Sequence, residues 1–326
     1  MSTTEPRPVP EVCTARPGGG LRRLTPRYVP LGGPRAMRVR RTLPQREQSL
    51  IGAWCFVDHY GPDDVGSSGG MVVPGHPHTG LQTVSWLFGG TIEHRDTLGT
   101  HALVRPGEMN LMTAGSGIAH SEHSTADTTV LHGVQLWLAL PAAHRATAPA
   151  FEHHVPEPVT VDGVGVSVFL GELLGRRSPV RTFTPLLGAE LTLPAGTRFV
   201  LPLDPSFEHG LLVDTGAVAV DDLDAAPGEL VHVPLGADRV VLGAGDEPVR
   251  VLLLGGEPFG EQVVMWWNFV GVDHDEVARA REDWQAERTA AGGERFGAFP
   301  EAWADSLPAP VLPPVRLRPR GEPSGG

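Results

Sequence analysis

Two short motifs concentrate residues that can bind a metal ion. The motif GHPHTG places His76 and His78 two positions apart, and the motif AGSGIAHSEHS places His120 and Glu122 at the same spacing. Side chains two apart in a strand point to the same face, so each pair directs its donor atoms together. Glycine turns beside both pairs allow neighbouring strands to converge. The spacing therefore predicts one site built from these four residues.

Three neutral imidazoles and one carboxylate suit a first-row divalent metal. In an octahedral ion, four protein ligands leave two positions for a substrate and dioxygen, which is the layout of an iron(II) oxygenase. Zinc accepts the same donors but favours four-coordinate closure. The donor set suits Fe(II) and also another divalent first-row metal, and the residues alone leave the identity of the metal open. Glu122 is the candidate catalytic base, because it is the one carboxylate in the predicted ligand set.

Three further side chains are candidates for the substrate pocket. Gln82, Trp86 and Phe88 share the parity of His76 and His78, provided that no bulge interrupts the strand. Gln82 can orient a water or a substrate by hydrogen bonds, but an amide cannot take a proton at neutral pH. Trp86 and Phe88 would line a wall for a flat aromatic substrate, with ordinary core packing as the alternative.

Other histidines have the wrong spacing for this site. His123 has the opposite parity to His120, and the adjacent His153 and His154 cannot share one face of a strand. His94 and Asp96 are two apart and could support the metal ligands from behind.

Composition indicates an all-β protein with two domains. The 326 residues include 41 glycines and 32 prolines, and short apolar stretches alternate with turn residues over most of the chain. The length fits two domains of ordinary size better than one. The formal net charge is -12, so no broad phosphate-neutralising surface is visible and direct binding to nucleic acid is not expected.

Five segments follow from the pattern of strands, turns and prolines. They are a flexible tail (1–26), a first β domain with the metal site (27–145), a second β domain (146–272), a helix with an extension (273–304) and a disordered tail (305–326). Asp273 and Glu276 form a capping box for the helix, and Val277, Ala280 and Trp284 lie on its apolar face.

The N-terminus has no signal-peptide pattern, and no apolar run approaches the length of a bilayer span. Cys13 and Cys55 are the two cysteines, so a disulfide framework is not expected. We therefore expect a cytoplasmic protein that does not engage the membrane.

Five segments together resemble the pirin family of the cupin superfamily: FVDHYGP, GHPHTGLQTVSWLFGG, EHRDTLGT, PGEMNLMTAGSGIAHSE and EPFGEQVVMWWNFVG. The resemblance implies two tandem cupin barrels, of the double-stranded β-helix or jelly-roll type, with a metal, usually iron, in the first. It implies the ligands His76, His78, His120 and Glu122. Gln82 stands where many cupins carry a ligating glutamate, but pirins take the carboxylate from the second motif. The second domain lacks such motifs and is expected to be metal-free.

The resemblance implies two alternative roles. One is a quercetin 2,3-dioxygenase-like reaction on a flavonol-like aromatic substrate with dioxygen. The other is a redox-dependent regulatory protein that binds a transcription factor or a metabolic enzyme. An open channel lined by aromatic residues would favour the enzyme, and a closed metal site would favour the regulator. A third alternative, a barrel that has lost its function, is disfavoured by the intact ligand set.

Overall fold

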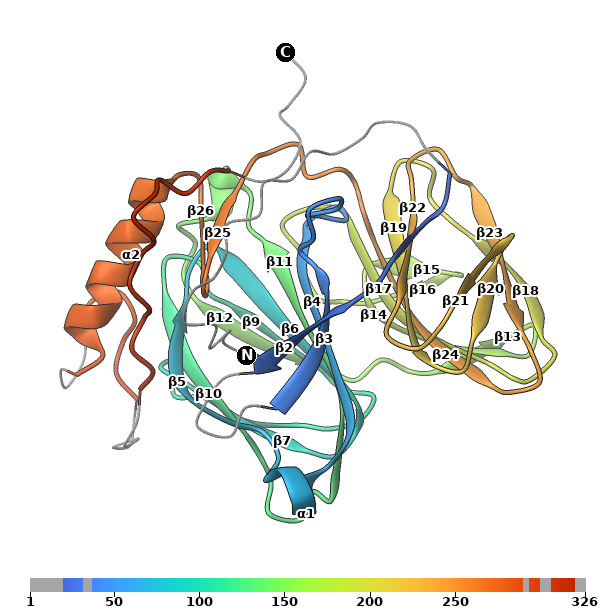
Figure 1. Cartoon of the computed structure of the whole chain (residues 1–326), viewed down its shortest axis with the longest axis horizontal. Helices are drawn as coiled ribbons and strands as arrows, with labels where there is room; N and C mark the ends of the chain where they lie inside the picture. Colours follow the sequence, from blue (N-terminus) through green and yellow to red (C-terminus); the bar gives the residue numbers. More distant parts are fainter. Residues whose placement is uncertain (1–19, 32–36, 290–292, 300–305, 320–326) are drawn as a thin grey trace.

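Two β barrels lie side by side, and a segment that includes a helix covers the outer side of the first barrel (Figure 1). The computed structural model describes residues 20–31, 37–289, 293–299 and 306–319. Strands dominate these residues, and the longest helix among them is α2 (His274–Glu287). The prediction of an all-β fold with two tandem barrels and a C-terminal helix is confirmed.

The first barrel contains eleven strands and two short helical turns. They are β2 (Arg27–Leu31), β3 (Met37–Leu43), β4 (Trp54–Asp64), α1 (Val65–Ser68), β5 (Val72–His78), β6 (Leu81–Gly89), β7 (Ile92–Asp96), β8 (His101–Val104), β9 (Met109–Thr113), β10 (Ile118–Ser124), β11 (Val130–Ala139), η1 (Ala142–His144) and β12 (Ala150–His154). A seven-stranded sheet has the order β12-β9-β6-β11-β4-β3-β2, and a four-stranded sheet has the order β5-β10-β7-β8.

The second barrel repeats this arrangement. Its elements are β1 (Arg22–Leu24), β13 (Val159–Val161), β14 (Val164–Leu170), β15 (Glu172–Leu173), β16 (Arg176–Arg177), β17 (Leu186–Leu193), β18 (Arg198–Pro202), β19 (Glu208–Thr215), β20 (Val218–Val220), β21 (Leu223–Ala225), β22 (Leu230–Val233), β23 (Arg239–Ala244) and β24 (Val249–Gly256). The sheets have the orders β1-β22-β19-β24-β17-β14-β13 and β18-β23-β20-β21, beside a separate β15-β16 hairpin. Strand for strand, β18 and β23 therefore occupy the positions of β5 and β10.

Both barrels take an edge strand from outside their predicted bounds. β1 lies inside the predicted tail 1–26, yet it pairs with β22, and Leu24 is buried between the barrels. β12 lies inside the predicted second domain, yet it pairs with β9 of the first barrel. These predictions are wrong for the two strands, because an exposed sheet edge recruits a short segment that has little strand pattern of its own. Residues 1–19 of the predicted tail lie outside the described residues.

The barrels pack through their seven-stranded sheets. Trp54 and Trp86 of the first barrel share one apolar cluster with Phe169 of the second, and the rings of Trp86 and Phe169 stack at 4.7 Å. The Trp54 indole N–H donates to the backbone oxygens of Leu187 and Gly255, at 3.2 and 3.1 Å. Because large aromatic side chains dominate such contacts, the two barrels are held as one packed unit.

The segment after the second barrel returns to the first. The hairpin of β25 (Val264–Trp266) and β26 (Phe269–Gly271) precedes α2 and bridges to Thr79 through Phe269. The Asp273 half of the predicted capping box is confirmed, since the Asp273 carboxylate accepts the Glu276 backbone N–H at 2.8 Å. The Glu276 carboxylate accepts the Val272 backbone N–H, at 2.7 Å, and not that of Asp273. The predicted apolar face is also confirmed, because the buried residues of α2 are Val277, Ala280 and Trp284.

The predicted disorder of residues 305–326 is wrong for residues 306–319. Ala309 and Leu317 are buried against the α2 cluster, and the Trp284 indole N–H donates to the Leu307 backbone oxygen at 2.8 Å. Ser306 forms a bridge with Gly75, next to the predicted ligands. The proline-rich composition of the segment does not predict this packing. The segment is held by contacts with other elements and has no regular structure of its own.

Among the described residues, no helix has the length and apolarity that a membrane crossing requires. Cys55 is a buried free thiol, and burial raises the pKa of Cys55 far above its usual value. Cys13 lies outside the described residues.

Candidate metal centre

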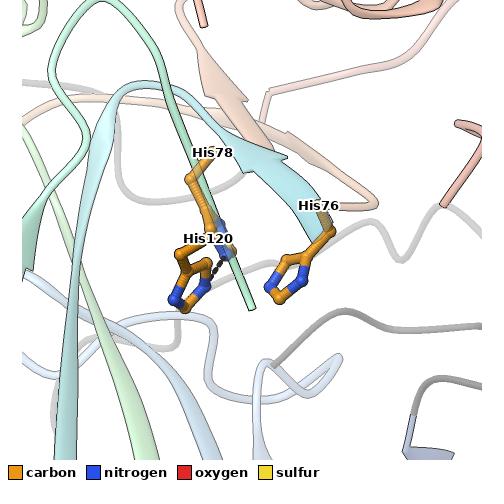
Figure 2. A group of neighbouring side chains, drawn as sticks. All are labelled: His76, His78 and His120. Carbon is orange, nitrogen blue, oxygen red and sulfur yellow. Dashed lines mark hydrogen bonds between the residues drawn. The ribbon is translucent and has the colours of Figure 1, made fainter. Parts of the chain in front are cut away.

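Three histidines from two adjacent strands meet inside the first barrel (Figure 2). His76 and His78 lie at the end of β5, and His120 lies on β10 directly opposite His76. The Nε2 atoms of His78 and His120 are 3.1 Å apart, and the ring centroids of His76 and His120 are 4.3 Å apart. One nitrogen from each ring lies within 4.8 Å of the others. The structure therefore brings three of the four predicted ligands to one point.

The three imidazoles are in the chemical state that a metal requires. Each is 0% exposed, and burial lowers the pKa of His76, of His78 and of His120 well below the usual value. They are therefore neutral at neutral pH, with lone pairs available. His76 Nδ1 lies 2.9 Å from the Pro74 carbonyl oxygen and donates to it, which leaves His76 Nε2 buried and without a hydrogen-bond partner. A metal ion fits these donors, because it would satisfy the orphaned nitrogen.

The fourth predicted ligand lies beside this group. Glu122 is 1% exposed and follows His120 by two residues on the same face of β10. A Glu122 carboxylate oxygen lies within 4.8 Å of nitrogen atoms of both His94 and His120. The Ser85 hydroxyl lies 3.3 Å from Glu122 Oε1 and donates toward it. His120 thus belongs to both groups, while coordination by Glu122 stays a prediction.

A tight turn reverses the parity that we predict for the pocket candidates. After His78 the chain turns at Gly80, where φ is +69° and an added Cβ would lie 2.1 Å from the Val270 backbone oxygen. Only glycine accepts both the left-handed conformation and this close approach. β5 and β6 are therefore separate strands in different sheets, and the alternation does not continue from one to the other.

The three pocket candidates consequently point away from the histidines, so this part of the prediction is wrong. The Gln82 side-chain amide donates to Thr113 Oγ1 at 2.9 Å on the face toward the second barrel. The Trp86 indole donates to Glu190 Oε2 at 2.7 Å, across the interface. Phe88 is packed beneath the guanidinium of a second-barrel arginine, 4.8 Å from the ring centroid.

Odd-numbered residues of β6 and β11 occupy the interior instead. Ser85 Oγ lies 3.0 Å from Gln135 Oε1 as well as near Glu122, and the Trp137 ring meets the His78 ring at 5.2 Å. Ser85 escapes the sequence reasoning because its orientation depends on where β6 begins, and Gln135 and Trp137 escape it because they depend on how β11 pairs with β6. The glycine in the HTGLQ run is the feature that could have shifted the assignment by one residue.

Two other histidines, His153 and His94, lie at different places relative to the three candidate ligands. His153 lies on the edge strand β12 and contacts the Asn110 side chain, away from the central group. His94 lies next to His120, with their Nδ1 atoms 3.3 Å apart, and its ring packs at 4.9 Å against Phe151. His94 therefore belongs to the environment of the candidate metal ligands.

Comparison with known proteins agrees with this geometry. The family model described as Pirin matches residues 36–138, and the model described as Pirin C-terminal cupin domain matches residues 188–290. A Pseudomonas aeruginosa protein described as "Putative quercetin 2,3-dioxygenase" is 44% identical over 302 residues, covering 92% of this chain and 93% of that protein. Human pirin is 32% identical and covers 76% of this chain and 86% of its own length.

A solved structure shows the same architecture. The quercetin 2,3-dioxygenase of Acinetobacter baumannii superposes with a TM-score of 0.85 at 38% sequence identity, covering 92% of this chain and 98% of that chain. Two cupin barrels, one of which gathers neutral imidazoles that could hold a metal ion, define a bicupin with a candidate metal centre. Within that class, the chain belongs to the pirin family.

Proposed function

We propose that this protein is a metal-dependent dioxygenase that acts on a flavonol-like aromatic substrate. The observation that carries the proposal is the buried convergence of His76, His78 and His120, with Glu122 beside them. The similarity to proteins described as quercetin 2,3-dioxygenases supports the substrate class and the use of dioxygen.

Iron(II) is the metal that we propose for this site, and another divalent first-row ion would accept the same donors. His76, His78, His120 and Glu122 would hold it. When bound, the ion would supply Lewis acidity toward the substrate oxygens and redox chemistry toward dioxygen. The orphaned His76 Nε2 and the neutral state of all three rings support this donor set.

The side chains around the ligands have separate tasks. In this proposal the Glu122 carboxylate takes the hydroxyl proton of a flavonol, and the Ser85 hydroxyl, 3.3 Å from Oε1, is its polar neighbour. Trp137 packs against His78, and Phe151 packs against His94. These two rings would provide the aromatic surface that the sequence assigns to Trp86 and Phe88. Burial of Ser85, Glu122 and Trp137 excludes water and strengthens the polar interactions of this group.

Oxygen uptake tests the proposed activity. Protein purified without oxygen and loaded with iron(II) should consume dioxygen when quercetin is added. The Glu122→Gln variant should consume dioxygen at least about 100-fold more slowly, as expected when a general base is removed. Glu93→Gln is a matched control, since Glu93 lies on neighbouring β7 and pairs with Arg95 and His101 instead. Equal uptake by Glu122→Gln and the wild type would contradict the role of Glu122.

One observation favours a second function. All three histidines are 0% exposed, so a flavonol would need part of the barrel to open before it reached them. A closed, redox-active centre suits a regulatory protein whose oxidation state changes a surface that binds a transcription factor or a metabolic enzyme. Iron retained by the three histidines without any oxygen uptake would move the assignment to this function.

A further inference from the structure

We propose that Asp96 and His94 form a hydrogen-bonded relay that decides which nitrogen of His120 carries a proton. The relay presents the Nε2 lone pair of His120 to the metal and holds the ring in place. Asp96 and His94 are therefore positioning residues, and the inference rests on the metal centre proposed above.

The contacts link His120, His94 and Asp96 in series. His120 directs Nε2 toward His78 and Nδ1 toward His94, whose own Nδ1 is 3.3 Å away. On the far side of the ring, His94 Nε2 lies 3.2 Å from Asp96 Oδ2. His94 is 3% exposed, and both Asp96 and His120 are 0% exposed. No bulk water competes for these contacts.

Asp96 is itself held by the loop that follows it. Its Oδ1 accepts the backbone N–H groups of Leu98 and Thr100, at 2.9 and 3.0 Å. The carboxylate can only accept, so Oδ2 requires a donor from His94. Both oxygens of Asp96 are thus committed, one to the backbone and one to the relay.

For a neutral His94, the proton count along the chain gives a single arrangement. A neutral imidazole carries one N–H, so donation from His94 Nε2 to Asp96 leaves His94 Nδ1 as an acceptor. That acceptor faces His120 Nδ1, which must then be the nitrogen that carries the proton. His120 Nε2 is left with its lone pair directed at the other two histidines. The opposite order would leave the His94 Nε2 lone pair facing the Asp96 carboxylate in a buried site, with no proton between the two acceptors.

The arrangement has consequences for the metal. A carboxylate behind a ligating imidazole fixes its tautomer and makes it a stronger donor. Here the carboxylate acts through one intervening ring. Stronger donation also favours the more highly charged state of a redox metal, so the relay should lower the reduction potential of bound iron.

Asp96→Asn tests the relay because an amide cannot accept on both sides. If the oxygen of the new amide keeps the backbone contacts, its NH₂ group faces His94 Nε2 and donates to it. His94 then carries its proton on Nδ1, and His120 carries its proton on Nε2. We expect zinc(II), measured by competition with a chromophoric chelator, to bind about 10–100-fold more weakly. Glu93→Gln makes the same carboxylate-to-amide change on the same strand, outside the relay, and should bind zinc normally.

Variants of His94 separate the relay from simple loss of folding, because they leave the Asp96 loop intact. His94→Leu removes both contacts and should weaken zinc binding to a similar degree. His94→Gln can accept at one end and donate at the other, so it should recover much of the affinity. In metal-free wild type, ¹⁵N NMR should show His120 protonated at Nδ1, and the potential of bound iron should rise in His94→Leu.

Normal zinc affinity and normal iron potential in both His94→Leu and Asp96→Asn would overturn the relay. His120 protonated at Nε2 in the metal-free wild type would also overturn it. These results are distinguishable from failure of the metal centre itself, since in that case His76→Ala would still bind zinc like the wild type. They are also independent of any oxygenase activity.

Discussion

The two barrels share one strand order, but matching strands carry imidazole side chains in the interior of the first barrel and apolar side chains in the interior of the second. In the first barrel, β5 and β10 bring His76, His78 and His120 together. In the second barrel, β18 and β23 occupy the same places in the sheet and contribute Leu201 and Leu242 to a continuous apolar core. The fold therefore supplies positions, and the residue types at a few of them decide whether chemistry is available.

The second barrel nevertheless contains a buried histidine. His209 is 0% exposed, and neither of its ring nitrogens has a hydrogen-bond partner among the described residues. Its ring fills the space beside Gly255, where an added Cβ would lie 2.9 Å from the imidazole. Burial lowers the pKa of His209 to about 4. A single imidazole without converging donors is a packing residue, so histidine content alone does not define a metal centre.

A histidine cluster between the barrels shows that convergence alone does not define one either. His59 and His132 both direct Nε2 at Asp214 Oδ1, at 2.8 and 2.6 Å, and Arg250 donates to Asp214 Oδ2 at 3.2 Å. Arg40 lies 3.1 Å from His59 Nε2. The Asp214 carboxylate already accepts from both imidazoles and from Arg250. The guanidinium groups of Arg40 and Arg250 would repel a cation. We interpret this cluster as an ionic contact that joins the barrels.

Removal of a ligand from the first barrel should have the largest effect. His76→Ala should weaken metal binding by roughly 70- to 800-fold, which is one ligand's share of the roughly 10–16 kcal/mol that a four-ligand site supplies. Gln82→Ala should keep normal metal content, because Gln82 faces the second barrel. Metal analysis after anaerobic purification measures both. Full metal content in His76→Ala would refute the assignment of the ligands.

Disruption of the cluster between the barrels should lower stability without loss of metal. Although burial acts to raise it, hydrogen bonds from His132 and His59 hold the pKa of Asp214 well below its usual value. Asp214→Ala should cost about 3–4 kcal/mol, within the range for a broken buried ion pair. Denaturant unfolding with metal analysis of the folded variant measures both quantities. Loss of metal together with unchanged stability would show that the cluster is a metal centre after all.

The smallest effect is expected in the second barrel and depends on pH. The pKa of His209 is about 4 in the folded chain and about 6.5 in the unfolded chain, so acidification protonates the unfolded state first. Stability is unaffected above pH of about 6.5 and falls by up to about 3 kcal/mol as the pH approaches 4.

Replacement of this imidazole should therefore stabilise the protein in acid. The wild type and His209→Leu should unfold at similar denaturant concentrations at neutral pH and diverge in favour of His209→Leu as the pH falls. The free energy of unfolding, measured at several pH values, provides the comparison. Parallel pH profiles for the two proteins would show that His209 is not held in the neutral form.

Local patterns in the sequence predict much of this molecule. The two-residue spacing in GHPH and AHSE places donor atoms on one face of each strand, and that face is a local property. The same holds for α2, where Asp273 caps the helix and Val277 and Trp284 lie on the buried face. Alternating apolar and turn residues were enough to predict two β domains.

Predictions that cross a turn, or that depend on another element, failed for a physical reason. One glycine, Gly80, separates β5 from β6, and a shift of one residue sends every side chain to the opposite face. Gln82, Trp86 and Phe88 were misplaced for this reason, and Ser85 and Trp137 were missed. β1 and the segment 306–319 are ordered by partners far away in the chain, which composition cannot reveal.

The sequence by itself therefore determined the class of fold, the two ligand motifs and the helix α2, because each depends on residues a few positions apart. The tertiary structure decided which residues surround the ligands, how Asp96 reaches His120 through His94, and why His59 and His132 serve the contact between the barrels. Those outcomes depend on the register of paired strands and on distances between elements, and neither is encoded in any short stretch of the chain.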